Sequence, residues 1–474
     1  MAAPPGPSEF GNLLLAPKVI KDPRGPIMDC TARYGSVWQS RIVDKRGVVR
    51  LVWLMGPAGN ERVLSPKYRD DFSWYEGYSF SMEPLFGRDI LFLLDDPKGT
   101  ASDGDSAEDA AVPGTTSAGM HTHRERLRLL IPAFHPRLDG EYLPDMAGII
   151  GSHLARLPTG QPIDLAWEIK RVTFHIVAQL LFGAPEQDLL HLTHLFEQVG
   201  LGLFSLVRLR IPGTNFYRAV RARAELSRYL LEKIAAYRRG EQLPPTMLAQ
   251  LMKQQTAAGD LLPDETLVAE MIAFLFAGYD TTSSMLTSLF VALGDHPEVY
   301  ARLCREVREG QEADRVAGAG DTQEQPYLDA VLLETERLFP PLLFAIRGAV
   351  RDFEFGGFQV SKGDKVAYSA YYTGRLAELW EEPLQYRPER FLGSRRVAPY
   401  TLLGFGGGHR ICIGKRFAAL EMRLFTSMLL QRFELTFVPQ KSDAVFFNPT
   451  LQRKHGYTCL LYTSVKCEAL FSLV

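Results

Sequence analysis

Apolar side chains recur at helical spacing along most of this chain and alternate at strand spacing in two regions. A repeat of about 3.6 residues predicts an amphipathic helix, whereas alternation predicts a half-buried strand. The helical repeat predicts long helices, for example over residues 165–182, 217–239, 264–293, 327–338 and 414–431. Strand-like patterns cover residues 36–63, with a hairpin at 44–47, and residues 353–360 and 364–368. The sequence therefore predicts a mainly α protein with a small β portion.

One segment interrupts this pattern. Residues 97–119 are almost wholly small, polar and acidic, so they lack the apolar side chains that a core needs. They predict a low-complexity, disordered insertion. No other change of composition divides the chain, and we expect residues 1–474 to form a single large domain.

The charge and hydropathy of the chain argue against a nucleic-acid partner and against a membrane-spanning helix. The chain has 53 Lys and Arg residues against 55 Asp and Glu, so no overall field attracts a nucleic acid and we expect no such partner. Its longest apolar stretch, residues 268–294, is interrupted by Asp280-Thr-Thr-Ser-Ser and predicts a buried core helix, not a membrane span. We expect a monomer without a transmembrane anchor in this chain, either soluble, in the cytoplasm or an organelle, or bound peripherally to a membrane.

Cys412 stands apart from the other cysteines. The five cysteines form no Cys-x-x-Cys pair and are odd in number, which argues against a disulfide framework and a tetrahedral zinc site. Cys412 lies in the glycine-rich run Phe405-Gly-Gly-Gly-His-Arg-Ile-Cys-Ile-Gly414, directly before a predicted helix. Glycines allow close approach to a flat ligand, a helix start favours a thiolate, and Arg410 offers a fork for an acid group. These features suit a haem with a cysteine axial ligand; a structural cysteine beside a glycine loop is the alternative.

This run matches F-x-x-G-x-R-x-C-x-G and resembles the signature of the cytochrome P-450 family, the haem-thiolate monooxygenases. The resemblance implies the cytochrome P-450 fold and haem b, iron protoporphyrin IX, as the cofactor. It implies that Cys412 is the axial ligand of the iron and that Phe405, Gly406, Gly414 and Arg410 contact the haem. Arg410 is expected at a haem propionate.

A polar group interrupts the most apolar predicted helix. Within Ala277-Gly-Tyr-Asp-Thr-Thr282, Thr281 can donate to the carbonyl of Ala277, which opens the helix and leaves room for water. The segment resembles the family's oxygen-activation groove, and the resemblance implies that Asp280 and Thr281 relay protons while Ala277 lines the haem pocket. A satisfied polar pair in a buried helix is the alternative.

Glu334-Thr-Glu-Arg337 resembles the family's E-x-x-R motif. The spacing alone carries little weight because it occurs five times in the chain, but here a double proline and then Arg347 follow it. The resemblance implies that Glu334, Arg337 and Arg390 form a buried cluster that supports the fold. It also implies that Arg347 reaches a haem propionate.

One position departs from the family pattern. Upstream of Pro132 the family places an aromatic residue or His and, four residues later, Arg or His, both directed at the propionates. Here His123 takes the first place and Leu127 the second. Arg126 and Arg128 flank Leu127, and a local shift would let one of them substitute.

The resemblance implies a monooxygenase that inserts one atom of O2 into a lipophilic substrate. Ile211-Pro-Gly-Thr214, with residues 217–223 after it, resembles the branch that contains retinoic-acid hydroxylases and plant sterol and terpenoid-hormone oxidases. This implies an isoprenoid, sterol or retinoid-like substrate. The apolar segments 200–207 and 342–346 are expected to shape its pocket.

The electron donor is expected to be a separate protein, a flavin reductase or a ferredoxin, because the chain has no flavin or nicotinamide fingerprint. Basic residues near the cysteine suggest a docking face for it, although a solvated charged surface explains them equally well. These residues are Lys415, Arg416, Arg423, Arg124, Arg126 and Arg128.

Two other functions stay open. A haem-thiolate isomerase or dehydratase of hydroperoxides needs neither O2 nor a reductase, but such enzymes commonly lack the pair formed here by Asp280 and Thr281. A haem-binding sensor without enzymatic activity is the other alternative.

Overall fold

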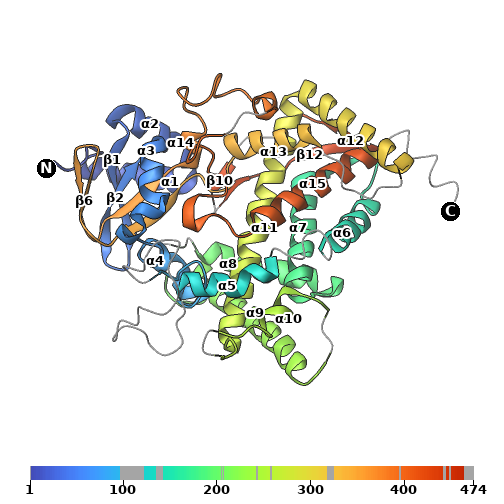
Figure 1. Cartoon of the computed structure of the whole chain (residues 1–474), viewed down its shortest axis with the longest axis horizontal. Helices are drawn as coiled ribbons and strands as arrows, with labels where there is room; N and C mark the ends of the chain where they lie inside the picture. The colour runs from blue at the N-terminus through green and yellow to red at the C-terminus, as the bar shows by residue number, and fades with distance from the viewer. Residues whose placement is uncertain are drawn as a thin grey trace.

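Helices predominate in the computed structural model, and they surround one long helix, α11 (Asp264–Asp295) (Figure 1). The structure describes residues 2–96, 122–134, 142–203, 205, 208–241, 244–256, 259–317, 325–393, 397–440, 445–447 and 450–463. The predicted disordered insertion, residues 97–119, lies outside the described residues.

The predicted long helices are confirmed. The helix over residues 165–182 has the predicted bounds. The other four begin and end within two residues of their predicted bounds. The α-helices are α1 (Glu9–Lys21), α2 (Arg24–Tyr34), α3 (Gly56–Leu64), α4 (Trp74–Phe86), α5 (His123–Phe134), α6 (Leu143–Ala155), α7 (Leu165–Phe182), α8 (Glu186–Leu203), α9 (Asn215–Arg238), α10 (Met247–Leu251), α11, α12 (Pro297–Ala317), α13 (Pro326–Leu338), α14 (Ala370–Thr373) and α15 (Lys415–Arg432).

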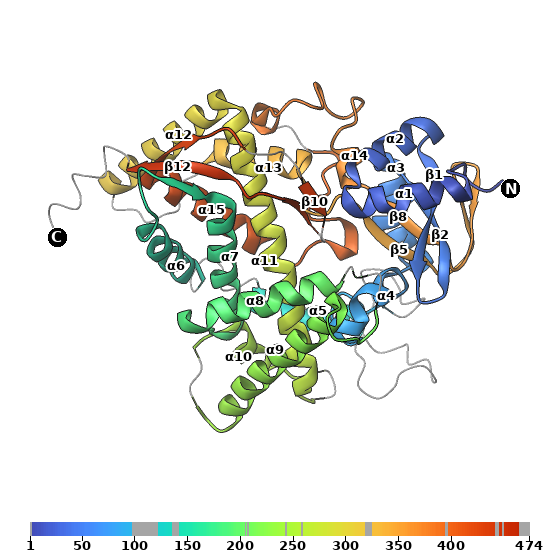
Figure 2. The ribbon, with the colours of Figure 1, turned by 180° about the vertical axis from the view of Figure 1, so that it is seen from behind.

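The helix α11 is buried over most of its length because α7, α9, α13 and α15 all pack against it. Its apolar side chains therefore face protein on nearly every side, which explains why most of this stretch is apolar in the sequence. Figure 2 shows the same arrangement from behind, with α7 and α15 on one side of α11 and the β-rich part of the chain on the other. Among the described residues, no helix has the length and apolar character needed to cross a bilayer.

The strands form small sheets, of which the largest has the order β1-β2-β8-β5-β3. The strands are β1 (Val37–Asp44), β2 (Gly47–Leu54), β3 (Phe72–Ser73), β4 (Pro162–Asp164), β5 (Ala345–Ala349), β6 (Phe353–Phe355), β7 (Phe358–Val360), β8 (Lys365–Tyr368), β9 (Phe433–Phe437), β10 (Val445–Phe447), β11 (Leu451–Arg453) and β12 (Thr458–Thr463). β1 and β2 are an antiparallel hairpin, whereas β2 and β8 pair in parallel.

The strand predicted over residues 36–63 is wrong beyond Leu54. Gly56 has φ +81°, which turns the chain, and α3 then begins with a proline in its first turn. Val63 and Leu64, which continue the apolar run, are buried from α3. A short apolar stretch does not distinguish a strand from a buried helix, so the turn decides.

The structure brings the predicted ion cluster of Glu334, Arg337 and Arg390 together. Arg337 donates two hydrogen bonds of 2.7 Å to the carboxylate of Glu334, and Arg390 donates one of 3.1 Å. The side chains of Glu334 and Arg337 are fully buried. The cluster ties α13 to the 3-10 helix η3 (Pro388–Phe391), and loss of one partner would leave a buried charge unpaired.

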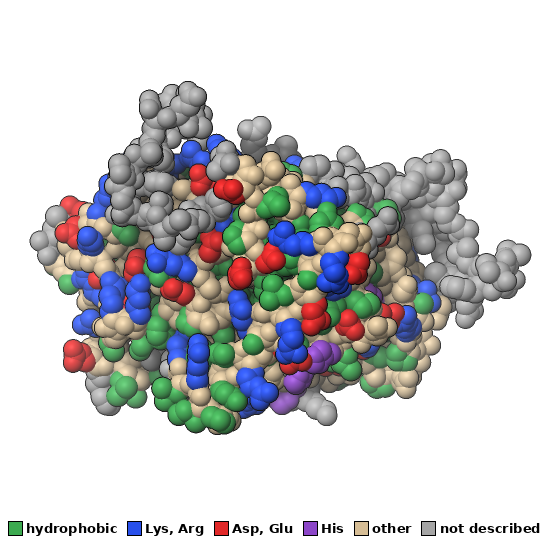
Figure 3. All heavy atoms as spheres, turned by 90° about the horizontal axis from the view of Figure 1, so that it is seen from below, with side chains coloured by type: hydrophobic (Ala, Val, Ile, Leu, Met, Phe, Trp, Pro, Cys, Tyr) green, Lys and Arg blue, Asp and Glu red, His purple; other side chains and the backbone are tan. Residues whose placement is uncertain are grey.

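Charged side chains of both signs are interspersed over the face of the molecule seen in Figure 3. This mixture agrees with the near balance of acidic and basic residues in the sequence.

Candidate functional site

A cavity of about 1560 Å³ lies between α11, the β-rich part and the segment Phe405–Gly414, which we call the cysteine loop. It is lined by most of the site residues predicted from the sequence: Ala277, Asp280, Thr281, His123, Phe405, Gly406, Arg410, Cys412 and Gly414. Arg347 lines a neighbouring hollow of about 150 Å³, which also contacts Arg410. The fold therefore brings together segments that are far apart in the sequence.

The cysteine loop owes its shape to glycine. Gly406 and Gly408 have φ values of +70° and +63°, and a Cβ at Gly408 would lie 1.9 Å from the carbonyl oxygen of Leu64. The backbone N–H of Cys412 donates to the carbonyl of Phe405 at 2.9 Å, which closes the turn. α15 begins three residues after Cys412, as expected.

Burial raises the pKa of the Cys412 thiol more than the backbone N–H of Gly414 and the charge of Lys415 lower it. The helix start therefore favours a thiolate, as expected, but desolvation of the sulfur outweighs this effect. A thiolate at this position needs a further positive charge next to the sulfur.

Unpartnered donors gather at the rim of the cavity. Nε1 of Trp74, Nε of Arg410 and Nδ1 of His409 are buried and have no hydrogen-bond partner among the described residues. Trp74 lies close to two cations, with the guanidinium of Arg347 3.6 Å and that of Arg410 5.3 Å from its ring centroid. Burial and the nearby charge of Arg410 lower the pKa of His123 to about 3 and that of His409 to about 4. Both histidines are therefore neutral at pH 7, and the arginines supply the positive charge.

Neither Arg126 nor Arg128 replaces the missing cation at Leu127. His123 and Leu127 are one helical turn apart on α5 and both line the cavity. Arg126 points elsewhere, fully buried, and pairs with Glu270 at 2.8 Å and Asp89 at 3.0 Å, while Arg128 is exposed. The predicted substitution is wrong because each neighbour is rotated about 100° from Leu127 around the helix.

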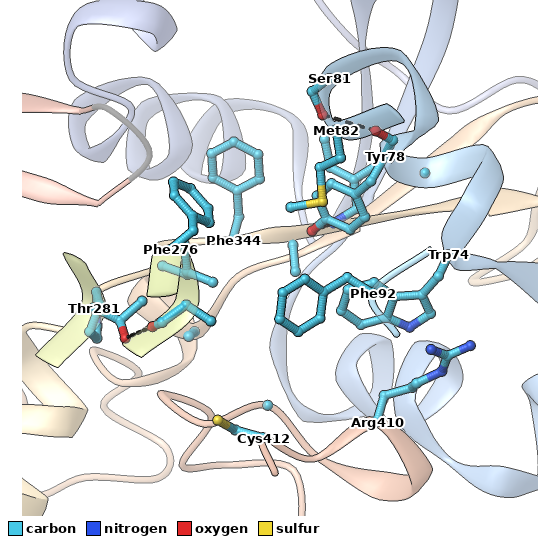
Figure 4. Close-up of a pocket in the computed structure, with 18 of the residues that line it drawn as sticks. Trp74, Tyr78, Ser81, Met82, Phe92, Phe276, Thr281, Phe344, Arg410 and Cys412 are labelled. Atoms are coloured by element: carbon cyan, nitrogen blue, oxygen red, sulfur yellow. Dashed lines mark hydrogen bonds between the residues drawn. The ribbon is translucent and has the colours of Figure 1, made fainter. Parts of the chain in front are cut away.

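The hydroxyl of Thr281 donates to the carbonyl of Ala277 at 2.5 Å, as predicted. Figure 4 shows Thr281 on α11 and Cys412 on the cysteine loop, both bordering the cavity.

The carboxyl of Asp280 is held by Thr450, which directly precedes β11, and by Gln452 within β11, a contact that the sequence did not predict. Its two oxygens accept hydrogen bonds of 2.6 Å from the hydroxyl of Thr450 and from the amide of Gln452. Lys170 on α7 donates to Gln452 at 2.7 Å, which extends the network. Burial raises the pKa of Asp280, so this carboxyl takes up a proton more readily than an exposed aspartate does.

The rest of the cavity is apolar and aromatic. Phe92, Phe276, Phe344, Met82 and Tyr78 surround the space beyond Thr281 and Cys412 (Figure 4). The segments expected to shape the pocket contribute to its wall, because Leu203, Ser205, Leu342, Phe344, Ala345 and Ile346 all line it.

Trp74, His409, Thr450 and Gln452 were not identified from the sequence. His409 lies inside the cysteine-loop motif, so its position in the sequence could have identified it as a site residue. Trp74 is the first residue of α4 and comes after the N-cap Ser73. Thr450 and Gln452 are placed by the pairing of β10 with β11. No local pattern marks these three residues.

Comparisons with known proteins agree with this geometry. The sequence model of the family described as Cytochrome P450 matches residues 114–460. A putative cytochrome P450 120 of Synechocystis is 34% identical over 349 residues, which cover 72% of this chain and 77% of that protein. A taxane 13-alpha-hydroxylase of Taxus cuspidata is 29% identical over 87% of this chain and 80% of its own length.

Two further proteins are similar. A beta-amyrin 28-monooxygenase of Vitis vinifera is 30% identical over 69% of this chain and 70% of its own length. The solved structure of a retinoic-acid-bound cyanobacterial CYP120A1 superposes with a TM-score of 0.81 at 27% identity. It covers 98% of this chain and 100% of that one.

Proposed function

This chain belongs to the cytochrome P450 family, whose members bind haem b and act as monooxygenases, and we propose that it inserts one atom of O2 into a lipophilic isoprenoid substrate. The observation that carries the proposal is that Cys412 and Thr281 border one large apolar cavity. Relatives named for taxane and beta-amyrin oxidation, and a structural neighbour named for bound retinoic acid, support the isoprenoid class.

The residues around the cavity fit a haem. The glycine turn permits close approach of a flat ring to Phe405, Gly406 and Gly414, and the sulfur of Cys412 would be the axial ligand of the iron. The unpartnered donors of Trp74, His409 and Arg410 suit the carboxylates of the propionates. Arg347 and His123 would complete that end of the site.

When bound, the haem supplies the iron at which O2 is cleaved, with one oxygen atom going to the substrate and the other leaving as water. The protein's part is to exclude water, orient the substrate and deliver protons. The aromatic wall serves the first two tasks, since Phe92, Phe276 and Phe344 offer apolar surface without competing donors.

Asp280 and Thr281 would deliver protons. The hydrogen bond from Thr281 to the carbonyl of Ala277 places a polar group where this apolar helix lines the cavity. The carboxyl of Asp280 has a raised pKa and is linked through Gln452 to the half-buried Lys170. Gln452, itself held by Lys170, would orient the carboxyl of Asp280, and this carboxyl would take up and release the proton.

We expect the protein to work as a monomer with a separate flavin reductase or ferredoxin. Two of the residues predicted to form the docking face are already engaged within the protein. Arg126 is buried, and Arg423 pairs with Asp329 at 2.8 Å. The remaining candidates for this face are Arg124, Arg128, Lys415 and Arg416, of which Arg128, Lys415 and Arg416 are exposed. Reversal of the charges at Arg128 and Arg416 should slow reduction by the partner and leave substrate affinity unchanged; equal rates would exclude these residues from docking.

The test is the spectrum of the reduced, CO-bound protein. We expect the band typical of a haem-thiolate, and its loss in Cys412→Ser. Retinoic acid and beta-amyrin should then be titrated while the spin state of the iron is followed, and O2 uptake should be measured with a surrogate reductase. Rearrangement of a hydroperoxide without O2 would favour the isomerase, and ligand binding without any product would favour the sensor.

A further inference from the structure

Glu336 on α13 is a buried acid that the E-x-x-R motif does not include. It lies two residues after Glu334, is 3% exposed and faces the cysteine loop instead of the ion cluster. A Cβ at Gly404 would lie 2.3 Å from Cγ of Glu336. The loop backbone is therefore packed directly on this side chain, and glycine is needed for that approach.

The carboxyl of Glu336 is connected to Cys412 through the loop backbone. It accepts hydrogen bonds from the backbone N–H groups of Gly404 and Phe405, and the carbonyl of Phe405 accepts the N–H of Cys412 at 2.9 Å. Through Glu336, α13 thus holds the loop at Phe405, the residue whose carbonyl fixes the backbone of Cys412.

Glu336 is also one of two charges that act on the sulfur. The charges of Glu336 and Lys415 have opposite signs, and both act on the sulfur of Cys412. Lys415 lies with its ammonium 5.4 Å from the ring centroid of Phe405 and attracts the carboxyl of Glu336. The two side chains therefore have opposite electrostatic effects at one atom.

We propose that Glu336 is a positioning residue for Cys412 and that, together with Lys415, it sets the reduction potential of the haem iron. The inference rests on the proposed role of Cys412 as the iron ligand. A negative charge near the sulfur opposes the gain of an electron by the iron, and a positive charge favours it. Hydrogen bonds that backbone N–H groups donate to a buried carboxylate are among the stronger ones in proteins, so they also keep the sulfur in place.

The first experiment is an equilibrium redox titration of the haem-loaded protein with chemical mediators and no protein partner. Burial raises the pKa of Glu336 to about 7, so the titration is made at pH 8, where the carboxyl is charged. Glu336→Gln then removes the charge with little change of shape and should move the potential in the positive direction. Lys415→Gln should move it in the negative direction. The control is Glu421→Gln on α15, where burial raises the pKa and keeps the carboxyl protonated. The amide there replaces a buried acid without removing a charge, so the potential should stay unchanged.

The second experiment measures positioning. Glu336→Leu removes both hydrogen bonds, and we expect its reduced, CO-bound form to lose the thiolate band about tenfold faster on mild warming than the wild type does. Melting temperatures of the variants without haem show whether the fold itself is weakened. A Glu336→Leu band as durable as that of the wild type, or a Glu336→Gln potential that does not move relative to Glu421→Gln, would overturn the inference. Absence of the thiolate band in the wild type would instead overturn the proposed function.

Discussion

The amide of Gln452 donates a 2.6 Å hydrogen bond to the carboxyl of Asp280, and so joins β11 to the centre of α11. Thr450 holds the other oxygen of the same carboxyl. Asp280, which the sequence motif placed in a buried helix, is therefore held by residues near the end of the described chain. Four predictions follow from this network and from the surrounding site.

Gln452→Leu should lower turnover less than Asp280→Asn does. The first variant breaks the link to Lys170 but leaves Asp280 with its bond to Thr450, whereas the second removes the titrating group. We expect a loss of about 100-fold for Asp280→Asn and a smaller loss for Gln452→Leu. Steady-state rates with a surrogate reductase, in H2O and D2O, measure both; equal losses would show that the link to Lys170 carries the whole effect.

Thr281→Ala should uncouple O2 consumption from product formation. Without the hydroxyl the groove beside Ala277 loses its fixed donor, and we expect the product formed per O2 consumed to fall about tenfold. Ser288→Ala is the control, because Ser288 bonds back to Ser284 in the same way at 2.9 Å on the same helix but does not line the cavity. If both variants stay as well coupled as the wild type, the hydroxyl of Thr281 has no part in proton delivery.

Trp74→Phe should weaken haem retention. The ring would still pack against Arg347 and Arg410, but the unpartnered indole donor would be gone. A hydrogen bond to a charged group contributes about 1.5–3 kcal/mol, so transfer of haem to apomyoglobin should be at least about tenfold faster. Trp380→Phe is the control, because its indole donates to the carbonyl of Thr373 outside the cavity. Identical transfer rates for the two variants would exclude Trp74 as a propionate donor.

Glu421→Gln should change how stability depends on pH. Burial raises the pKa of Glu421 well above its usual 4.5, so the folded protein keeps a proton that the unfolded chain releases as the pH rises. This acid therefore lowers the free energy of unfolding by up to about 1.4 kcal/mol per pH unit above 4.5, until the folded pKa is reached.

The amide cannot titrate, so the stability of the variant relative to the wild type should increase between pH 5 and pH 8. Urea unfolding at several pH values measures this difference. A difference independent of pH would mean that Glu421 has the same pKa in the folded and unfolded chain.

Much of the site was predictable because its motifs are local. The cysteine loop, the bond from Thr281 to Ala277 and the cluster around Glu334 all depend on residues that lie close in sequence or on motifs that resemble one family. Hydrophobic periodicity likewise predicted the long helices, since it reports directly which face of a helix is buried.

Only the tertiary structure decided which distant groups meet and which charges remain unpaired. Arg126 stands beside Leu127 in sequence but turns to Glu270, and Trp74 and Gln452 reach the site from segments without a motif. The pKa of Cys412 likewise depends on burial by the whole fold, which no local pattern reveals. The physical reason is that desolvation and partner choice depend on every element packed around a group, whereas local sequence determines only the element on which that group lies.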